Sequence, residues 1–289
     1  MKELVPGEPL VAFHNVSIGF DEGDVLKGIS FDLWPSETIV LLGVSGSGKT
    51  LILKLAAGLI RPGAGRVFVM GQNVGTMYER NLLDFRRNIG FVFQEGALFD
   101  SMSVEENVAF RMREEHTAEG EIEKRVRQAL AFVEMEHAID QFPAELSGGM
   151  RRRVSIARAL VNQPRLVFYD SPTAGLDPIT SQTIINLIMR GRDTQGVSSL
   201  LATHRVQDAF GLAHFRFDKA TGKVLPLSTN GAKPVARAPA PTDSVRGTNG
   251  STQTKIVVLR DGRIYFQGST DEVLHSSDEY LKEFLASAE

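Results

Sequence analysis

The sequence predicts an α/β fold in which a mostly parallel sheet is flanked by helices, with an antiparallel β subdomain and an inserted helical subdomain. Short β-rich runs alternate along the chain with helix-like segments, and this alternation is typical of layered α/β folds. Between Phe91 and Gln163 the pattern changes to consecutive helices. We therefore expect a helical subdomain at about residues 95–163, inserted into the α/β core.

The individual elements follow from the local pattern. Leu166, Val167 and Phe168 form a continuous apolar run, which suits a central parallel strand that is covered on both faces. Such β-rich runs predict strands at 11–18, 38–42, 66–70, 89–93, 165–169 and 197–203. The helical subdomain is predicted to contain helices at 104–115, 119–137 and 147–162.

The composition changes near the C-terminus. Residues 219–254 are rich in Pro, Ala, Gly, Ser and Thr, and this composition predicts a disordered insertion. The basic residues of this stretch leave open a weak attraction to anionic lipid or to another subunit, beside the simpler interpretation of a solvated linker. Asp261-Gly262 then predicts a hairpin between 255–260 and 263–267. We expect a single domain over residues 10–289 that ends in this hairpin and helices at 255–289.

Composition excludes several classes of function. The chain has 289 residues, of which 42% are hydrophobic, so it can bury a substantial core. A net charge of -3 gives no basic field for nucleic acid, and the absence of cysteine excludes disulfides and thiolate metal sites. The N-terminal residues do not resemble a secretory signal, and no apolar run approaches the ~20 residues of a membrane-spanning helix. We expect a cytoplasmic protein with any membrane role provided by a partner.

A glycine-rich turn follows the strand predicted at 38–42. The turn reads Gly43-Val44-Ser45-Gly46-Ser47-Gly48-Lys49-Thr50, and a helix-like segment follows from Leu51. The glycines allow backbone N–H groups to surround phosphates, Lys49 adds a positive charge, and the Thr50 hydroxyl can bind Mg²⁺. This is a phosphate-binding P-loop in its required strand-to-helix context. The nucleotide-binding candidates here are Gly43, Ser45, Gly46, Ser47, Gly48, Lys49, Thr50 and Leu51.

Two further segments extend this chemistry. Asp170 ends the strand at 165–169, where a carboxylate can reach Mg²⁺, although an acid there can also cap a helix. Ser147, Gly148 and Gly149 open a predicted helix whose N–H groups and positive dipole form a second phosphate site. Two phosphate sites on one chain would be redundant. Two copies packed head to tail would instead place the P-loop of one copy opposite Ser147 of the other.

The order of these motifs resembles the nucleotide-binding domain of ABC transporters. It includes the P-loop, Gln94, Leu146-Ser147-Gly148-Gly149, Asp170, Gly175-Leu176-Asp177-Pro178 and His204. By that resemblance the cofactors are ATP and Mg²⁺. Phe20 would stack on adenine, Asp177 would lie at the dimer interface, and Thr50, Gln94 and Asp170 would bind the metal. Gln94, Asp170, Ser171 and His204 would form the catalytic set.

Two segments, 93–108 and 169–179, further resemble the ATPases of Mla/Mce-type lipid transporters. This resemblance implies phospholipid transport, with the chain peripheral at the cytoplasmic face of the inner membrane. The implied partners are a second copy of the chain, integral-membrane permease subunits and a periplasmic or membrane-anchored Mce/Mla-type lipid-binding protein, with no nucleic acid.

Ser171 departs from the family pattern, which has glutamate at this position as general base. A serine hydroxyl can hold a water molecule but is a poor base at neutral pH. The sequence therefore leaves three functions open: a slow transport ATPase, which we favour, a hydrolysis-poor regulatory subunit, and a soluble ABC ATPase without a transport role.

Overall fold

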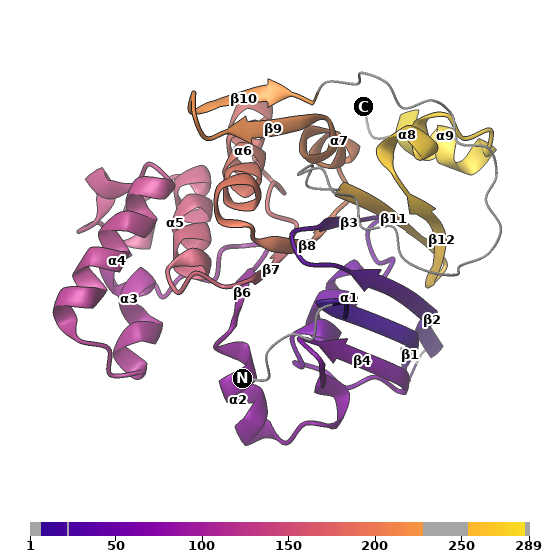
Figure 1. Cartoon of the computed structure of the whole chain (residues 1–289), viewed down its shortest axis with the longest axis horizontal. Helices are drawn as coiled ribbons and strands as arrows, with labels where there is room; N and C mark the ends of the chain where they lie inside the picture. The colour runs from indigo at the N-terminus through magenta and orange to yellow at the C-terminus, as the bar shows by residue number, and fades with distance from the viewer. Residues whose placement is uncertain (1–6, 22, 228–253, 287–289) are drawn as a thin grey trace.

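A six-stranded sheet forms the centre of the protein. The computed structural model describes residues 7–21, 23–227 and 254–286. Within them the sheet order is β12-β11-β3-β8-β7-β6, parallel throughout except for β12, which pairs antiparallel with β11 (Figure 1). The strands are β3 (Thr38–Leu42), β6 (Ile89–Val92), β7 (Leu166–Asp170), β8 (Ser198–Thr203), β11 (Thr254–Arg260) and β12 (Arg263–Gly268). The predicted mostly parallel sheet is confirmed.

The two faces of the sheet contribute to two different cores. Ile39 and Leu41 of β3 belong to a core shared with α1 and the antiparallel strands. Val40 and Leu42 point the other way, into a core shared with α5, α6 and α7. The helices are α1 (Lys49–Ala56), α5 (Gly148–Leu160), α6 (Pro178–Gln195) and α7 (Val206–His214). Burial on both faces explains why β3, β7 and β8 contain so few exposed polar residues.

A second, antiparallel sheet lies below the first in Figure 1, in the order β2-β1-β4-β5. Its strands are β1 (Val11–Phe20), β2 (Gly23–Leu33), β4 (Ala64–Val69) and β5 (Gln72–Asn73). The sequence analysis assigned no strand to the residues of β2. That strand alternates buried Leu26, Phe31 and Leu33 with exposed residues, and register shifts against β1 interrupt the simple period of two.

The helical part lies at the opposite end of the molecule from the antiparallel sheet (Figure 1). It contains α3 (Val104–Glu114), α4 (Glu119–Phe132) and the N-terminal end of α5, while the short α2 (Glu79–Arg86) precedes β6. Ser103 caps the start of α3 in a capping box with Glu106, in which each side chain accepts from the other residue's backbone N–H. The helix predicted at 119–137 is wrong beyond Phe132, because Glu134 takes a left-handed conformation and ends the helix.

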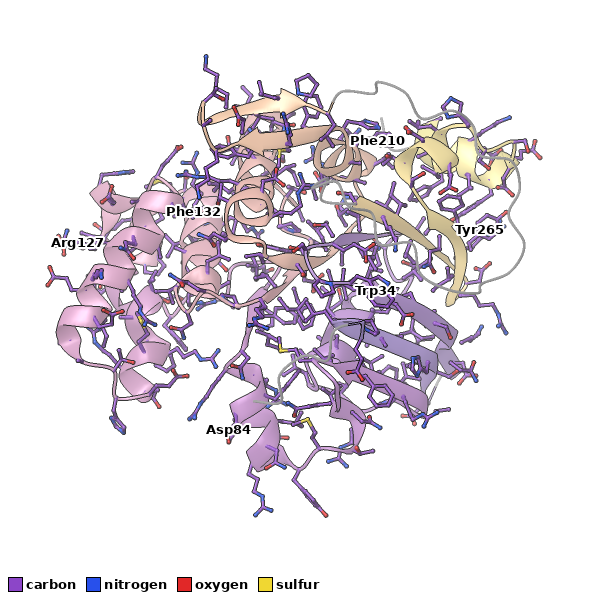
Figure 2. All side chains as sticks on the ribbon, in the orientation of Figure 1. Trp34, Asp84, Arg127, Phe132, Phe210 and Tyr265 are labelled. Carbon is purple, nitrogen blue, oxygen red and sulfur yellow. The ribbon has the colours of Figure 1, made fainter. Side chains whose placement is uncertain are left out.

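The helical part is joined to α6 by a cation–π contact. The guanidinium of Arg190 lies 4.6 Å from the ring centre of Phe132 and donates to the Phe132 carbonyl at 3.0 Å. Figure 2 shows Phe132 at the junction of these helices.

The irregular segment predicted from Lys219 is wrong at its start. β9 (Phe215–Asp218) pairs with β10 (Lys223–Pro226) because Phe217 and Val224 pack against the core while Gly222 supplies a left-handed turn. Residues 228–253 of the prediction lie outside the described residues, and Thr254 already belongs to β11.

The hairpin predicted at Asp261-Gly262 is confirmed. Both residues have positive φ, 52° and 77°, as a type I′ turn requires. Two short helices follow β12, α8 (Thr270–Leu274) and α9 (Glu279–Ala286). Within the described residues, no helix combines the length and the apolar character that crossing a membrane requires.

Candidate nucleotide-binding site

A pocket of about 390 Å³ lies where parallel strands of the central sheet end. The loops after β3, β6, β7 and β8 all reach it, because parallel strands place their carboxyl ends at one edge. The pocket brings together nine residues predicted from the sequence: Ser45, Gly46, Gly48, Lys49, Thr50, Leu51, Gln94, Ser171 and His204. Val25 and Ala174, which sequence reasoning missed, complete the lining.

The glycines of the P-loop fill specific backbone requirements. Gly48 has φ of 95°, and a Cβ there would come within 2.4 Å of the Leu26 side chain. Gly43 lies so close to β11 that a Cβ would meet the carbonyl oxygen of Leu259 at 2.8 Å. A side chain at either position would therefore displace the loop.

Lys49 carries the positive charge of the loop. Its Nζ donates to the carbonyl oxygens of Gly43 at 2.7 Å and Val44 at 2.9 Å. Burial lowers the pKa of Lys49, and attraction to Asp170 opposes this shift. A buried ammonium of this kind gains from any anion that enters the pocket.

Asp170 and Thr50 form the oxygen-rich part of the site. The Thr50 hydroxyl donates to the Asp170 carboxylate at 3.0 Å, and burial raises the pKa of Asp170 despite this bond. The described residues contain no cluster of three or more His, Cys, Asp or Glu side chains suited to a metal. Oxygen donors beside a phosphate loop nevertheless fit Mg²⁺, which binds proteins through few carboxylates and takes further ligands from phosphates and water. Thr50, Asp170 and Gln94 would hold it, and the ion would neutralise phosphate charge.

Ser171 takes a left-handed conformation, with φ of 47°. Its N–H donates to the carbonyl of Ala202 at 2.8 Å, and its hydroxyl donates to Asp170 at 3.5 Å. The serine thus lies beside the Asp170 carboxylate within the pocket. His204 contributes an exposed ring from the loop after β8.

A buried acid that the sequence analysis missed lies behind these loops. Asp208 in the first turn of α7 is 2% exposed and accepts bonds from Thr173 and Thr203. Its position four residues after His204 is the one signal in the sequence that could have drawn attention to it.

Eight predicted residues lie outside the pocket lining: Phe20, Gly43, Ser47, Ser147, Gly148, Gly149, Asp170 and Asp177. Ser147, Gly148 and Gly149 start α5, where the Ser147 hydroxyl accepts from the N–H of Met150 at 3.3 Å. Phe20 is 58% exposed at the end of β1.

Asp177 also lies outside the lining and caps α6. Its carboxylate accepts from the N–H groups of Ile179 and Thr180 at 3.0 Å each. Hydrogen bonding from Thr180 lowers the pKa of Asp177. Its predicted place at a dimer interface stays a prediction.

A second hollow of about 460 Å³ adjoins the nucleotide pocket, since Gln94 and Ala174 line both. Gly148, Arg151 and Arg152 form its other wall. The start of α5 therefore faces the same side of the molecule as the P-loop.

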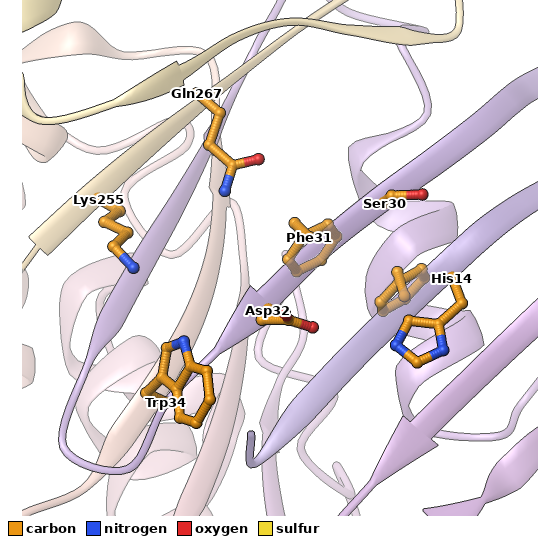
Figure 3. Close-up of a pocket in the computed structure, with 8 residues that line it drawn as sticks. His14, Ser30, Phe31, Asp32, Trp34, Lys255 and Gln267 are labelled. Atoms are coloured by element: carbon orange, nitrogen blue, oxygen red, sulfur yellow. The ribbon is translucent and has the colours of Figure 1, made fainter. Parts of the chain in front are cut away.

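A third hollow of about 370 Å³ lies between the antiparallel sheet and the β11–β12 hairpin (Figure 3). His14, Asp32 and Trp34 face Lys255 and Gln267 across it. The Lys255 ammonium is paired at 2.6 Å with the buried carboxylate of Glu37. The hollow lacks the glycine-rich loop of the P-loop pocket, so it does not compete as a phosphate site.

The comparison with protein families identifies the chain. The sequence profile of the family described as ABC transporter matches residues 26–174, which is more than half of the sequence. The chain belongs to the ABC transporter family. The matched span of this ABC protein contains the P-loop, Gln94, Ser147 and Asp170.

Curated relatives differ in what their names describe. The chain is 40% identical over 210 residues to Protein TRIGALACTOSYLDIACYLGLYCEROL 3, chloroplastic, of Arabidopsis thaliana, covering 68% of this chain and 60% of the relative. It is 38% identical over 202 residues to Methionine import ATP-binding protein MetN of Mannheimia succiniciproducens, covering 70% and 55%. The ABC chain thus spans little more than half the length of either relative.

Solved structures share the fold over most of the chain. CbiO1 from Clostridium perfringens, part of the ABC transporter complex cbiONQ, has a TM-score of 0.73 at 26% identity and covers 92% of this chain and 91% of its own. The ATP-binding cassette MJ0796, in a dimeric post-hydrolysis state with ADP and Pi, has a TM-score of 0.69 at 25% identity, covering 90% and 98%. The predicted α/β fold with its antiparallel and helical parts is confirmed.

Proposed function

We propose that this chain is the ATP-binding and ATP-hydrolysing subunit of an ABC transporter, and that it powers phospholipid transport through a separate membrane permease. The observation that carries the proposal is the pocket in which the Lys49 ammonium and Thr50, hydrogen-bonded to Asp170, meet Gln94, Ser171 and His204. The proposed reaction is hydrolysis of ATP to ADP and phosphate. Such phosphoryl transfer depends mainly on positioning and charge stabilisation, which these groups can supply.

Each group has a distinct proposed task. Lys49 and the P-loop N–H groups bind the phosphates, and Asp170 with Thr50 holds Mg²⁺. Gln94 and His204 orient the attacking water. Ser171 holds that water by a hydrogen bond but removes its proton poorly, so we expect slow turnover. Phe20, exposed at the end of β1, is free to stack on the adenine ring.

We propose that the working form contains two copies. Ser147 lies outside the lining of the P-loop pocket of its own chain. The hollow beside Gly148 faces the same side as the pocket and joins it at Gln94, so a second copy can close over both. The dimeric MJ0796 cassette supports this arrangement. Asp177 would then lie at the interface.

We propose that the permease docks in a groove of about 350 Å³ beside β6. Phe91, Phe93, Phe99 and Phe110 line it together with Arg86, Arg87, Arg111 and Arg158. An apolar helical segment of a membrane subunit fits this lining, because aromatic and arginine side chains favour interfaces. Phe93 directly precedes Gln94, so the groove and the nucleotide pocket share one loop. The chain would then be peripheral at the cytoplasmic face of the inner membrane.

Identity values do not separate lipid from methionine as the substrate, since the two relatives match at 40% and 38%. The Mla/Mce-type resemblance of segments 93–108 and 169–179 favours phospholipid, as does the lipid in the name of the first relative. An Mce/Mla-type lipid-binding protein is the further partner that this substrate implies.

One reconstitution tests the proposal. The chain would be co-expressed with the membrane protein encoded beside it, and the purified complex placed in phospholipid vesicles. We expect ATP hydrolysis that requires the membrane subunit and transfer of labelled phospholipid that requires ATP. Stimulation by methionine, with no phospholipid transfer, would replace the lipid assignment.

A second function is favoured by Ser171 alone. If the serine prevents hydrolysis, the chain is a subunit that binds ATP and regulates a transporter without consuming it. Single-turnover measurement with [γ-³²P]ATP separates the two, because the regulatory subunit would retain intact ATP while lipid transfer continues.

A further inference from the structure

Asp208 is a buried acid with two hydroxyl donors. Its Oδ2 accepts from the Thr173 hydroxyl at 2.6 Å and from the Thr203 hydroxyl at 2.7 Å. The three side chains are almost fully enclosed, with exposed fractions of 0–2%. Direct hydrogen bonds thus bridge three segments of the chain.

The two threonines lie beside two pocket residues, Thr173 in the loop after β7 and Thr203 at the end of β8. Thr173 lies two residues after Ser171, and Thr203 directly precedes His204. The strands before these loops, β7 and β8, pair as far as Asp170 and Ala202, and one more backbone bond joins Ser171 N–H to Ala202. β7 ends at Asp170, and beyond it Asp208 links the loop after β7 to the end of β8. The bridge therefore fixes Ser171 relative to His204.

Burying this carboxylate is costly in isolation. Burial raises the pKa of Asp208, although the Thr173 and Thr203 hydrogen bonds oppose the shift, as do the nearby charges of Arg205 and His204. The Arg205 Nε is 3.8 Å from the other carboxylate oxygen. An apolar side chain could fill the same space without this cost. A negative charge in the first turn of α7 interacts favourably with the helix dipole, but an exposed acid would do the same, so the dipole does not explain why Asp208 is buried.

We propose that Asp208 is a positioning residue that holds the Ser171 loop and the His204 loop in one fixed arrangement, so that both side chains act on the same water molecule. The inference rests on the proposed hydrolysis at this site. Misplacing a reacting group by about 1 Å can cost roughly 100-fold in rate. Loss of the bridge should thus reduce turnover without affecting the P-loop.

The test compares Asp208→Ala, Thr173→Val and Thr203→Val with wild type in the assembled transporter. Each threonine variant removes one hydroxyl while retaining the branched shape, so it keeps the test valid if Asp208→Ala fails to fold. We expect kcat to fall roughly 10- to 100-fold, with the dissociation constant for Mg-ATP within threefold of wild type. Adding Thr173→Val to Asp208→Ala should cause little further loss, because both changes break one bridge.

Asp218→Asn provides a matched control. Asp218 accepts from the Thr221 hydroxyl at 2.6 Å in the exposed turn after β9, so the substitution alters an aspartate–threonine bond distant from the pocket. We expect wild-type turnover from this variant. Equal kcat in Asp208→Ala and wild type, with a lower unfolding temperature alone, would assign Asp208 a purely structural role.

Hydrogen exchange separates this inference from the proposed function. Amides of 171–174 and 203–205 should exchange faster in Asp208→Ala than in wild type when both are saturated with Mg-ATP, while the P-loop stays protected. If wild type shows no hydrolysis but this exchange difference is present, the hydrolytic function fails and the bridge stands. Unchanged exchange in both segments would overturn the bridge itself.

Discussion

Lys49 places a buried ammonium where an anion can reach it, and its hydrogen bonds to the carbonyls of Gly43 and Val44 hold it against the loop. Replacing it with alanine removes the side-chain cation of the P-loop. We expect Lys49→Ala to weaken Mg-ATP binding roughly 10- to 100-fold, since a hydrogen bond to a charged group contributes about 1.5–3 kcal/mol. Titration calorimetry measures this, with Lys124→Ala on the exposed side of α4 as the control. Equal affinities in wild type and Lys49→Ala would remove the phosphate assignment.

Ser171 limits the chemical step if our account of the pocket is correct. Ser171 already has positive φ, so a glutamate would meet the same backbone geometry rather than a new strain. General-base assistance is typically worth ~10²–10⁴-fold, and we expect Ser171→Glu to raise kcat about tenfold or more even with imperfect placement. The Mg-ATP dissociation constant should hardly change, because the gain lies in the transition state.

Ser171→Gln is the control for this change, since it has the size of glutamate without a base. Steady-state phosphate release from the assembled transporter measures all three proteins. A flat kcat in Ser171→Glu, combined with loss of activity in His204→Ala, would show that hydrolysis here does not depend on a carboxylate.

At the level of elements, α5 holds the loop that contains Gln94. Arg152 donates to the carbonyl of Phe93 at 2.7 Å, and Ser155 donates to Gly96 at 3.0 Å. Arg158 donates to Gly96 and Ala97, at 2.7 Å each. These residues recur every three positions on one face of the helix. These hydrogen bonds therefore join the helix that Ser147 caps and the loop that begins at Phe93 into one unit.

Arg158→Met tests this unit, because it keeps the apolar stem and removes both donors. We expect a loss of roughly 2 kcal/mol in unfolding free energy, since two carbonyls lose their charged partner. Turnover should fall as the Gln94 loop loosens. Arg153→Met on the same helix is the control, as its guanidinium pairs with the exposed Glu134 at 3.4 Å, in an ion pair worth about 0–1 kcal/mol. Urea denaturation compares the two, and equal losses would contradict the special role of Arg158.

The sequence predicted those elements whose signals are local. Apolar runs identified β3, β7 and β8, and Asp261-Gly262 identified the hairpin, because burial on two faces and positive φ each leave a direct mark on residue choice. The nucleotide pocket was also predictable, because the carboxyl ends of parallel strands meet at one edge of the sheet.

Elements defined by distant contacts were not predictable. β2 follows an alternating pattern with register shifts against β1, and β10 depends on Val224 packing against a core that the chain builds elsewhere. The sequence analysis did not single out Asp208, because its threonine partners lie 35 and 5 residues away. The fold brings both threonines to its carboxylate, and the link between them is visible only in three dimensions.

For the whole molecule, the adjoining pockets predict dimerisation on ATP. Light scattering should show that the chain is mostly monomeric alone and associates with Mg-ATP, between Gly43–Thr50 of one copy and Ser147–Gly149 of the other. Gly148→Asp should abolish this association, because its carboxylate repels phosphate. The substitution should spare the fold, since a Cβ there meets Leu176 at an ordinary 3.6 Å and an acid suits a first turn.

Gly120→Asp is the matched control, because Gly120 also lies in the first turn of a helix and has open space around it. It should dimerise like wild type. Association of Gly148→Asp at the same Mg-ATP concentration as wild type would contradict the proposed head-to-tail dimer.

The pairing of β3 with β11 also sets when the phosphate loop can form during synthesis. Leu42 lies beside Val258, and the carbonyl of Leu259 packs against Gly43, so the P-loop near the start of the chain is completed by a strand near its end. At typical translation speeds the intervening residues take on the order of 10–40 s to appear. During that interval β3 lacks its neighbour on this side. A nascent chain stalled before residue 254 should therefore bind no ATP, however complete its own P-loop sequence is.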